Sequence, residues 1–458
     1  MPMSVAKFES MLKTNDVYFF DANEFEIIIQ HYLTVGKHSL AKKAVRLGLD
    51  QHPGAICLKL LKTELLVFEN HMKEAVELLT EIEAVEPHNE EVFIQKATIL
   101  SKKKKHKEAI LLLKKSLDYT DDPLDIWAMM GMEYLYMDDF DNARLNFAKC
   151  IDVDYEDYSS LYNIIYCFEM QENYEEAVKF LNSFIDNNPY CEIAWHQLGR
   201  QYYELGMFKE ALTAFDYSVI IDETFIGGYL EKAKVLEEIE CYEEAIENYL
   251  VTLELDDPTA YAYTRIGECF EKLELYDNAI QYYKKAINED PVLDKPWLLL
   301  ANVYFRDENY QKAIYYINKA IEIDDANPVF WRKYGEINIK LNFYEEAVKA
   351  FERCIDLGDI AIEIYVALSD VLFFLGEVDD ALAIMIRAKN DYKDFAEVEY
   401  RLFGLFHLVN KKDVALTHLK NALAIDFDYH SIIKDVFPSV FDVPSAKKII
   451  ADFKKATE

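Results

Sequence analysis

The chain has 458 residues, of which 83 are acidic and 49 are basic, so its formal net charge at pH 7 is −34. Such an acidic chain argues against a nucleic-acid-binding protein, because phosphate binding needs a basic face that releases counterions. Hydrophobic residues (51%) and aromatic residues (14%) are too frequent for charged disorder. Glycine (13) and proline (11) are scarce, which predicts long helices rather than hairpins or glycine-rich phosphate loops.

The start of the chain, residues 1–15, carries charged residues and has no apolar run of signal-peptide length. The longest uncharged apolar stretch, residues 296–305, is about half of a membrane span. The seven cysteines are widely spaced and form no C-x-x-C pair, which indicates reduced thiols rather than a disulfide or zinc framework. We therefore expect a soluble, cytoplasmic protein without membrane insertion.

A 34-residue repeat organises the chain from residue 22 to residue 429, after a predicted N-terminal capping helix within residues 1–21. Its clearest marker is an alanine that we place at position 20 of every unit. These alanines occur without any insertion between units: Ala41, Ala75, Ala109, Ala143, Ala177, Ala211, Ala245, Ala279, Ala313, Ala347, Ala381 and Ala415. The phase predicts twelve units of two helices each.

Other positions of the unit share a residue type. Position 4 is aromatic in nine units, and all four tryptophans of the chain occur there. Positions 8 and 27 are mostly small, which marks places where two helices approach closely. Proline ends several units at position 32, where its missing N–H stops the second helix. The recurring aromatic residues at position 4, which we call the aromatic stripe, are therefore interpreted as packing residues rather than as a cofactor or base-stacking site.

These residues resemble the tetratricopeptide repeat, whose pattern is W-x₂-L-G-x₂-Y, then A-x₃-F, then P. The best match is Trp195, Leu198, Gly199, Tyr202, Ala211 and Phe215. The resemblance implies an all-α fold, a right-handed superhelical solenoid of stacked antiparallel helix pairs in a single elongated domain. It also implies a protein-binding scaffold, although the family binds many unrelated partners.

Some units depart from the pattern. The fifth has Ile165 and Phe184 at the two small positions, which should push neighbouring helices apart. The twelfth has Glu399 and Phe403 at positions 4 and 8. Residues 430–458 continue the phase weakly and predict a degenerate thirteenth unit with a C-terminal capping helix.

The chain shows no constellation of catalytic residues, no metal-ligand spacing and no cofactor motif, so we expect no enzyme activity, no metal and no cofactor. One basic cluster stands out, Lys102–Lys105 with Lys107, in the turn of the third unit. It is interpreted either as a solvated turn or as a docking patch for an acidic partner or phosphate.

The resemblance implies a concave groove lined by positions 2, 5, 9 and 12 of each first helix. Over the twelve units these positions hold twelve acidic and four basic residues, which favours a protein or peptide partner of basic character. Exposed aromatic and basic residues at such positions are typical interface anchors. The candidate binding residues are Tyr162, Tyr166, His196, Arg200, Tyr203, Lys234, Glu268, Glu336 and Asp370.

The leading hypothesis is a non-enzymatic scaffold or adaptor that holds a peptide segment or a partner protein in this acidic groove. The alternative is a regulatory or assembly subunit of a larger complex that acts through its convex face and its ends. Alanine substitution of Tyr166, Arg200 and Lys234 separates the two, because only the first requires the groove.

Overall fold

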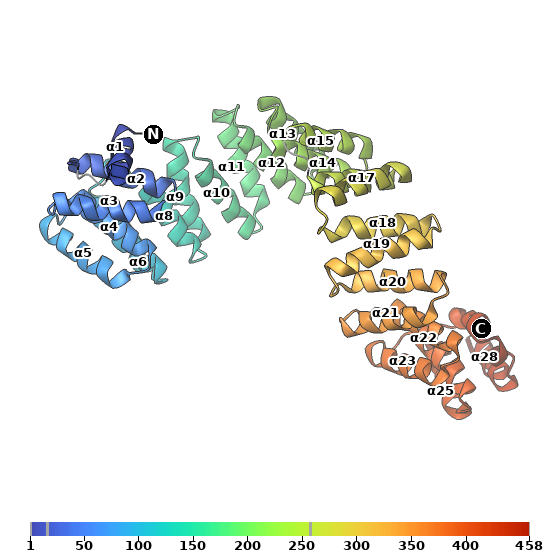
Figure 1. Cartoon of the computed structure of the whole chain (residues 1–458). Coiled ribbons are helices and arrows are strands. Elements are labelled where there is room, and N and C mark those ends of the chain that lie inside the picture. Colours follow the sequence, from blue (N-terminus) through green and yellow to red (C-terminus); the bar gives the residue numbers. More distant parts are fainter. Residues whose placement is uncertain (1, 15–17, 256–258, 458) are drawn as a thin grey trace. The chain divides into compact units, whose positions relative to one another are not determined.

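The computed structural model describes residues 2–14, 18–255 and 259–457, and every regular element within these ranges is a helix (Figure 1). The predicted all-α class is confirmed. The helices form two compact units, Met1–Gly228 and Tyr229–Glu458. Each repeat contacts mainly its sequence neighbours, as expected of a repeat array. Of the predicted capping segment and repeats, residues 1, 15–17 and 256–258 lie outside the described residues.

Helix pairs follow one another at the predicted spacing. The first helices are α2 (Ala22–Thr34), α4 (Ile56–Phe68), α6 (Glu90–Lys102), α8 (Leu124–Leu135), α10 (Tyr158–Met170), α12 (Glu192–Glu204), α14 (Ile226–Glu238), α16 (Ala260–Lys272), α18 (Asp294–Arg306), α20 (Pro328–Lys340), α22 (Ile362–Leu375) and α24 (Ala396–Leu408). The second helices are α3 (His38–Gln51), α5 (Met72–Val85), α7 (His106–Ser116), α9 (Phe140–Val153), α11 (Tyr174–Asn187), α13 (Phe208–Ile221), α15 (Tyr242–Leu255), α17 (Tyr276–Glu289), α19 (Tyr310–Ile323), α21 (Tyr344–Asp356), α23 (Val378–Asp391) and α25 (Lys412–Ile425).

The two helices of each pair are joined by the same turn. Position 15 of every repeat has a left-handed backbone, with φ between 52° and 87°. The N–H of the next residue closes the turn onto the carbonyl five residues back, as His71 does with Leu66 at 2.8 Å. Position 15 is glycine in three repeats and asparagine in three, and a Lys, Asp or Glu there costs about 1 kcal/mol. Packing of the helix pair, rather than turn propensity, therefore imposes this turn in half of the repeats.

The alanine at position 20 is fully buried in all twelve repeats. A second close contact joins glycine at position 8 to an aromatic ring at position 24. A Cβ atom added to Gly199 would lie 2.6 Å from the Phe215 ring, and one added to Gly267 would lie 2.5 Å from the Tyr283 ring. The small residues predicted to mark close helix approach thus do so.

Three of the four tryptophans, Trp195, Trp297 and Trp331, tie their first helix to the end of the preceding repeat. The indole Nε1–H of Trp195 donates to the carbonyl of Pro189 at 2.9 Å, and that of Trp297 donates to Pro291 at 3.1 Å. Because the polar atom of the ring is used inside the stack, the aromatic stripe is structural, as predicted.

The fifth repeat is looser within its pair. Ile165 and Phe184 are buried at the two positions that are small elsewhere. Helices α10 and α11 approach each other less closely than the paired helices of the fourth and sixth repeats. The expected separation of neighbouring helices is confirmed.

The twelfth repeat replaces the aromatic residue of position 4 with a buried carboxylate. Glu399 is 3% exposed, and its two oxygens bind Lys389 Nζ at 2.7 Å and His418 Nδ1 at 2.5 Å. Burial alone would raise the pKa of Glu399, but the hydrogen bonds from His418 and Lys389 outweigh it and lower that pKa. The departure in sequence is thus a buried carboxylate, bonded to Lys389 and His418, that joins α23, α24 and α25.

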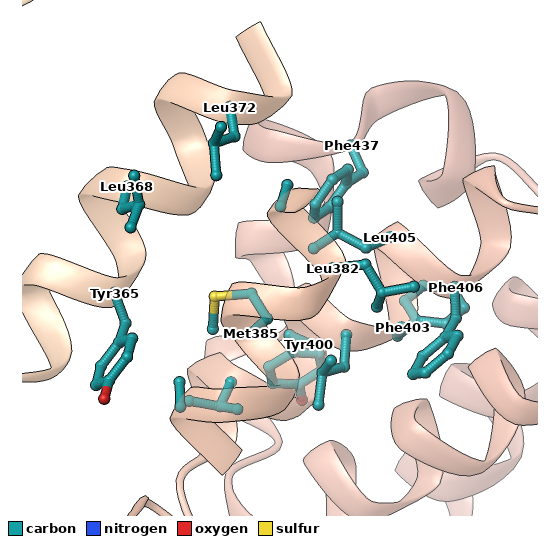
Figure 2. Close-up of a cluster of buried hydrophobic side chains, with 14 of the residues drawn as sticks. Tyr365, Leu368, Leu372, Leu382, Met385, Tyr400, Phe403, Leu405, Phe406 and Phe437 are labelled. Atoms are coloured by element: carbon teal, nitrogen blue, oxygen red, sulfur yellow. The ribbon is translucent and has the colours of Figure 1, made fainter. Parts of the chain in front are cut away.

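Helices outside the twelve pairs lie at both ends. At the front, α1 (Met3–Thr14) buries Phe8 against α2. At the back, η1 (Asp428–Ser431), α26 (Ile432–Val436), α27 (Pro438–Phe441) and α28 (Pro444–Thr457) follow α25. Phe437 packs on α24 at Gly404, beside the buried residues of the last repeats (Figure 2).

Gly199→Ala should destabilise the sixth repeat by about 1–3 kcal/mol, because the new methyl group overlaps the Phe215 ring. Urea unfolding measures the loss. Gly54→Ala is the matched control, since nothing lies within 4 Å of the added Cβ. Phe215→Leu added to Gly199→Ala should recover part of the loss, and equal stabilities of the two glycine variants would contradict the close contact.

Glu399→Gln should lower the stability of the second unit by about 3 kcal/mol at pH 7, because it removes one charge of a buried ion pair. A carboxylate with a lowered folded pKa stabilises above its ordinary value of 4.5, and this contribution is lost as the pH falls through the lowered value. The difference between wild type and variant should therefore shrink at pH 3. Glu352→Gln, at an exposed position of α21, is the control. A pH-independent difference would contradict the pairing of Glu399 with Lys389.

Candidate protein-binding groove

The predicted groove positions recur on one face of each first helix, because positions 2, 5, 9 and 12 are three or four residues apart. Among the first helices, α2 contacts α4, α4 contacts α6, α10 contacts α12 and α18 contacts α20. At these places the groove faces of successive repeats adjoin, and the two units are described separately.

Two of the predicted aromatic anchors are exposed in the first unit. Tyr162 and Tyr166, one turn apart on α10, are 41% and 47% exposed. Tyr203 on α12 is half-buried, with its ring 5.7 Å from that of Phe208. The structure thus leaves the tyrosines of α10 available to a partner, whereas Tyr203 is also part of the packing.

The predicted basic anchors are engaged within the chain. His196 is half-buried and its ring lies 5.1 Å from that of Phe225. Arg200 donates to Gln197 Oε1 at 3.1 Å and pairs with Glu169 at 3.3 Å. In the second unit, Lys234 pairs with Glu231 on its own helix at 2.7 Å.

The groove acids of the middle repeats form an ion-pair network in the second unit. Arg265 binds Glu237 at 2.6 Å and Glu268 at 3.0 Å. Lys295 also binds Glu268, at 2.7 Å. The Tyr249 hydroxyl donates to Glu237 at 2.6 Å, and the pKa of Tyr249 is raised by burial and by this bond. Glu268 is therefore neutralised by cations of its own chain.

The other predicted acidic residues of the groove are also paired. Lys333 binds Glu336 at 2.6 Å, and the Arg401 guanidinium binds both Asp370 and Glu397. Arg401 lies outside the four groove positions, as do Arg265 and Lys333. A charge count over those positions alone therefore overstates the negative charge that these repeats offer to a partner.

Carboxylates that form no ion pair among the described residues instead line a cleft of about 620 Å³ between the third and fourth repeats. Most of its lining surface is polar, although Leu60, Ile94 and Ile126 also line it, and the groove residues Glu91 and Asp125 lie at its wall. Five carboxylates line the cleft, and none of its lining residues is Lys or Arg: they are Glu90, Glu91, Asp121, Asp122 and Asp125. We call this the acidic cleft.

The electrostatics of the acidic cleft favour a cation. Burial raises the pKa of Glu91, and the negative charges of Glu64 and Asp125 raise it further, although Gln95 donates to its carboxylate at 2.8 Å. A raised carboxyl pKa means that the ionised form lacks compensating positive charge. An ammonium or guanidinium group entering the cleft would supply that charge.

The acidic cleft was not among the predicted sites because its far wall is a loop. Helix α7 ends at Ser116, and residues 117–123 carry Asp121 and Asp122 to the cleft before α8 begins. The signal in the sequence was the acidic run around Pro123. Its position over the groove depends on where α7 stops, which the repeat phase does not define.

A second cleft of about 620 Å³ lies in the second unit, on α20, α22 and α24. Its floor is apolar, with Ile339 and Val366, and exposed Phe374 (68%) stands at its edge. Glu363 is exposed and without an ion-pair partner among the described residues, in contrast to Asp370 beside it. This cleft suits an apolar side chain more than a charge. We call it the apolar cleft.

The remaining predicted absences can be compared only with the described residues. Among these, no group of three or more His, Cys, Asp or Glu is arranged to hold a metal ion. No helix in the same ranges is long and apolar enough to cross a membrane. Cys354 is fully buried, and burial raises its pKa to about 12, as suits a structural thiol at position 27.

Helix pairs of 34 residues with fixed small and aromatic positions define a helical-repeat protein. The tetratricopeptide repeat model matches residues 128–190 and 230–293. The model described as anaphase-promoting complex, cyclosome, subunit 3 matches residues 271–354. No curated protein matches the chain. Together with the repeat phase, these matches show that the chain contains tetratricopeptide repeats, and they support a role in protein interaction or assembly.

Several solved structures are similar. The crystal structure of MamA is 24% identical with a TM-score of 0.33, over 35% of this chain and 94% of that one. The C-terminal part of a tetratricopeptide-repeat protein from Cytophaga hutchinsonii is 17% identical with a TM-score of 0.45, over 50% and 95%. The Cut9–Hcn1 hetero-tetramer of the anaphase-promoting complex is 14% identical with a TM-score of 0.37, over 94% and 90%.

The carboxyl of Glu91 should titrate above its ordinary pKa, and Asp125→Asn should lower that pKa by removing a neighbouring negative charge. Titration of the ¹³C carboxyl resonances measures both effects. Asp50→Asn, away from this cleft, should leave Glu91 unchanged. If Asp125→Asn leaves the Glu91 titration unaltered, the two carboxylates do not share a cleft.

Proposed function

We propose that this protein is a non-enzymatic cytoplasmic scaffold that holds a basic segment of a partner protein in its groove. The observation that carries the proposal is the acidic cleft, where five carboxylates and no Lys or Arg line a mostly polar surface that also includes Leu60, Ile94 and Ile126. A partner segment with Lys or Arg beside an apolar side chain matches both features.

The exposed tyrosines of α10 extend the proposed interface within the same unit. Tyr162 and Tyr166 lie at groove positions of the fifth repeat, and the acidic cleft uses groove positions of the third and fourth. Tyrosine offers a large apolar area with a polar tip, which makes it a common interface anchor. A partner segment lying along the groove would contact the carboxylates of the acidic cleft with one part and the two tyrosines with the next.

The ion-paired acids of the second unit are not expected to attract the partner. A partner that approached Glu268 or Glu336 would have to displace Arg265, Lys295 or Lys333, so these acids add little net attraction. The apolar cleft of the same unit offers a second place for an apolar side chain of the partner.

A second candidate function is a subunit of a larger assembly, acting through its convex face and ends. The match of residues 271–354 to the model of an anaphase-promoting complex subunit favours it. Under this function, Tyr166→Ala, Arg200→Ala and Lys234→Ala together should leave partner capture intact. Under the groove function, the same triple variant should weaken partner capture, through the loss of the exposed Tyr166 side chain.

The groove function is tested with a fluorescein-labelled Lys-rich peptide that carries Leu at every third residue. Fluorescence anisotropy should show saturable binding to the full chain that weakens as salt is raised. Glu91→Gln with Asp125→Asn should weaken it about tenfold, since two charge contacts of somewhat under 1 kcal/mol each are lost.

Glu74→Gln with Glu77→Gln is the matched control, because it makes the same charge change at exposed positions of α5. Equal weakening in both double variants would show that the peptide responds only to net charge. That result, or an absence of saturable binding, would overturn the groove function.

A further inference from the structure

One edge of the first unit has the opposite charge to the rest of the chain. Segments 34–46 and 102–114 contain the turns of the first and third repeats with most of the helix that follows. Together they carry ten Lys or Arg residues and one acidic residue. The equivalent segments of repeats four to six, 136–148, 170–182 and 204–216, carry three basic and nine acidic residues.

The two basic turns flank the turn of the second repeat. On one side, Lys42 at the start of α3 forms an ion pair with Glu69 at the end of α4. On the other side, Lys102 Nζ donates to the carbonyl of Val67, in the last turn of α4, at 2.9 Å. Three successive turns therefore lie side by side. Helix α5 between them carries Glu74 and Glu77, so the basic character belongs to the turns and to α3.

A cleft of about 420 Å³ opens at this edge between α3 and α4. Its wall carries Lys42, Arg46, Lys62 and His71, and its floor is apolar. None of its lining residues lies at groove positions 2, 5, 9 or 12. We call this the basic cleft, and it is separate from the groove of the proposed function.

The lysine of the basic cleft lacks the partner that its counterpart has. Lys62 is at position 7, and at the same position one repeat later Lys96 binds Glu83 at 2.5 Å. The residue that corresponds to Glu83 in the preceding repeat is Leu49, which lines the basic cleft. The repeat geometry thus brings Lys62 towards a leucine where Lys96 meets a carboxylate.

Neither Lys62 nor Arg46 has an ion-pair partner among the described residues, and both side chains are exposed. Of the two acids at the cleft, Glu69 is already bound by Lys42, and Asp50 remains. A carboxylate from outside would complete the pair that Lys62 lacks, while an apolar side chain beside it would cover Leu49 and Leu65.

We propose that the basic cleft and the adjoining turn at residues 102–107 dock an acidic segment of a partner protein, with one apolar side chain of that segment in the cleft. This goes beyond the groove function and does not depend on it. The floor of the cleft is aliphatic, with Leu49, Leu65 and Leu66, and no Phe, Tyr or Trp lines it. It therefore suits an apolar side chain of a protein segment better than a nucleic-acid base, which stacks on aromatic rings.

In the turn at residues 102–107, the lysines whose side chains form no bond among the described residues are the ones that can contact the docked segment. Lys102 is bound to the Val67 carbonyl, and Lys105 pairs with Glu108 at 2.9 Å. Lys103, Lys104 and Lys107 are exposed and have no ion-pair partner among the described residues. They provide positive charge beyond the cleft for further Asp or Glu side chains of the docked segment.

The test uses a fluorescein-labelled Glu-rich peptide with a central Leu-Phe pair and the full-length chain. Anisotropy should show saturable, salt-sensitive binding, and Arg46→Glu with Lys62→Glu should weaken it at least about tenfold. Lys179→Glu with Lys209→Glu makes the same charge change on α11 and α13 and should leave binding within about twofold of wild type. Circular dichroism checks that both double variants remain folded.

A second variant tests the cleft without a charge reversal. Leu49→Glu gives Lys62 the partner that Glu83 gives Lys96, and it should weaken peptide binding by occupying the site from within. The proposal is overturned if the peptide does not bind, if the control variants lose binding equally, or if replacing Leu-Phe by Ser-Ser leaves affinity unchanged. Equally tight binding of a single-stranded DNA of the same charge would overturn the protein-segment class.

Discussion

The close approach of paired helices at small residues is the constraint on which the rest of the structure depends. Alanine at position 20 has no exposed surface in any of the twelve repeats, and glycine at position 8 receives an aromatic ring from position 24. Only side chains this small let the helices pack at that distance. The same spacing forces the left-handed residue at position 15, even where the residue is Glu240 or Lys104. The turn between the helices and the packing of each helix pair are thus set by the same close contact in every repeat.

Surface residues differ from repeat to repeat on this common backbone. Charged residues with and without ion-pair partners lie on different parts of the surface. In the first unit, carboxylates without lining cations gather at the acidic cleft, and unpaired cations gather at the basic cleft. In the second unit, the groove acids Glu237, Glu336 and Asp370 are paired with Arg265, Lys333 and Arg401. The net charge of −34 therefore describes no single face. What a partner meets depends on which acids the chain has already neutralised.

Most of the fold could be predicted from the sequence, because a 34-residue phase repeated twelve times fixes helix pairs and buried positions such as Ala279. The site was harder to predict. Glu268 is a groove residue as expected, but its partners Arg265 and Lys295 come from two different helices and decide its charge. The acidic cleft needs the loop at residues 117–123, whose course depends on where α7 ends. Periodicity describes positions within a repeat and says little about pairs between repeats.

The central claim is that the first unit carries two docking faces of opposite charge, one in the groove and one on the turn edge. Methyl NMR of the full chain with labelled Ile and Leu residues tests it directly, in titrations with the Lys-rich and Glu-rich peptides. The account predicts that the Lys-rich peptide shifts the signals of Ile94 and Ile126, and that the Glu-rich peptide shifts those of Leu65 and Leu66. Shifts at the same methyl groups with both peptides, or at neither pair, would contradict it.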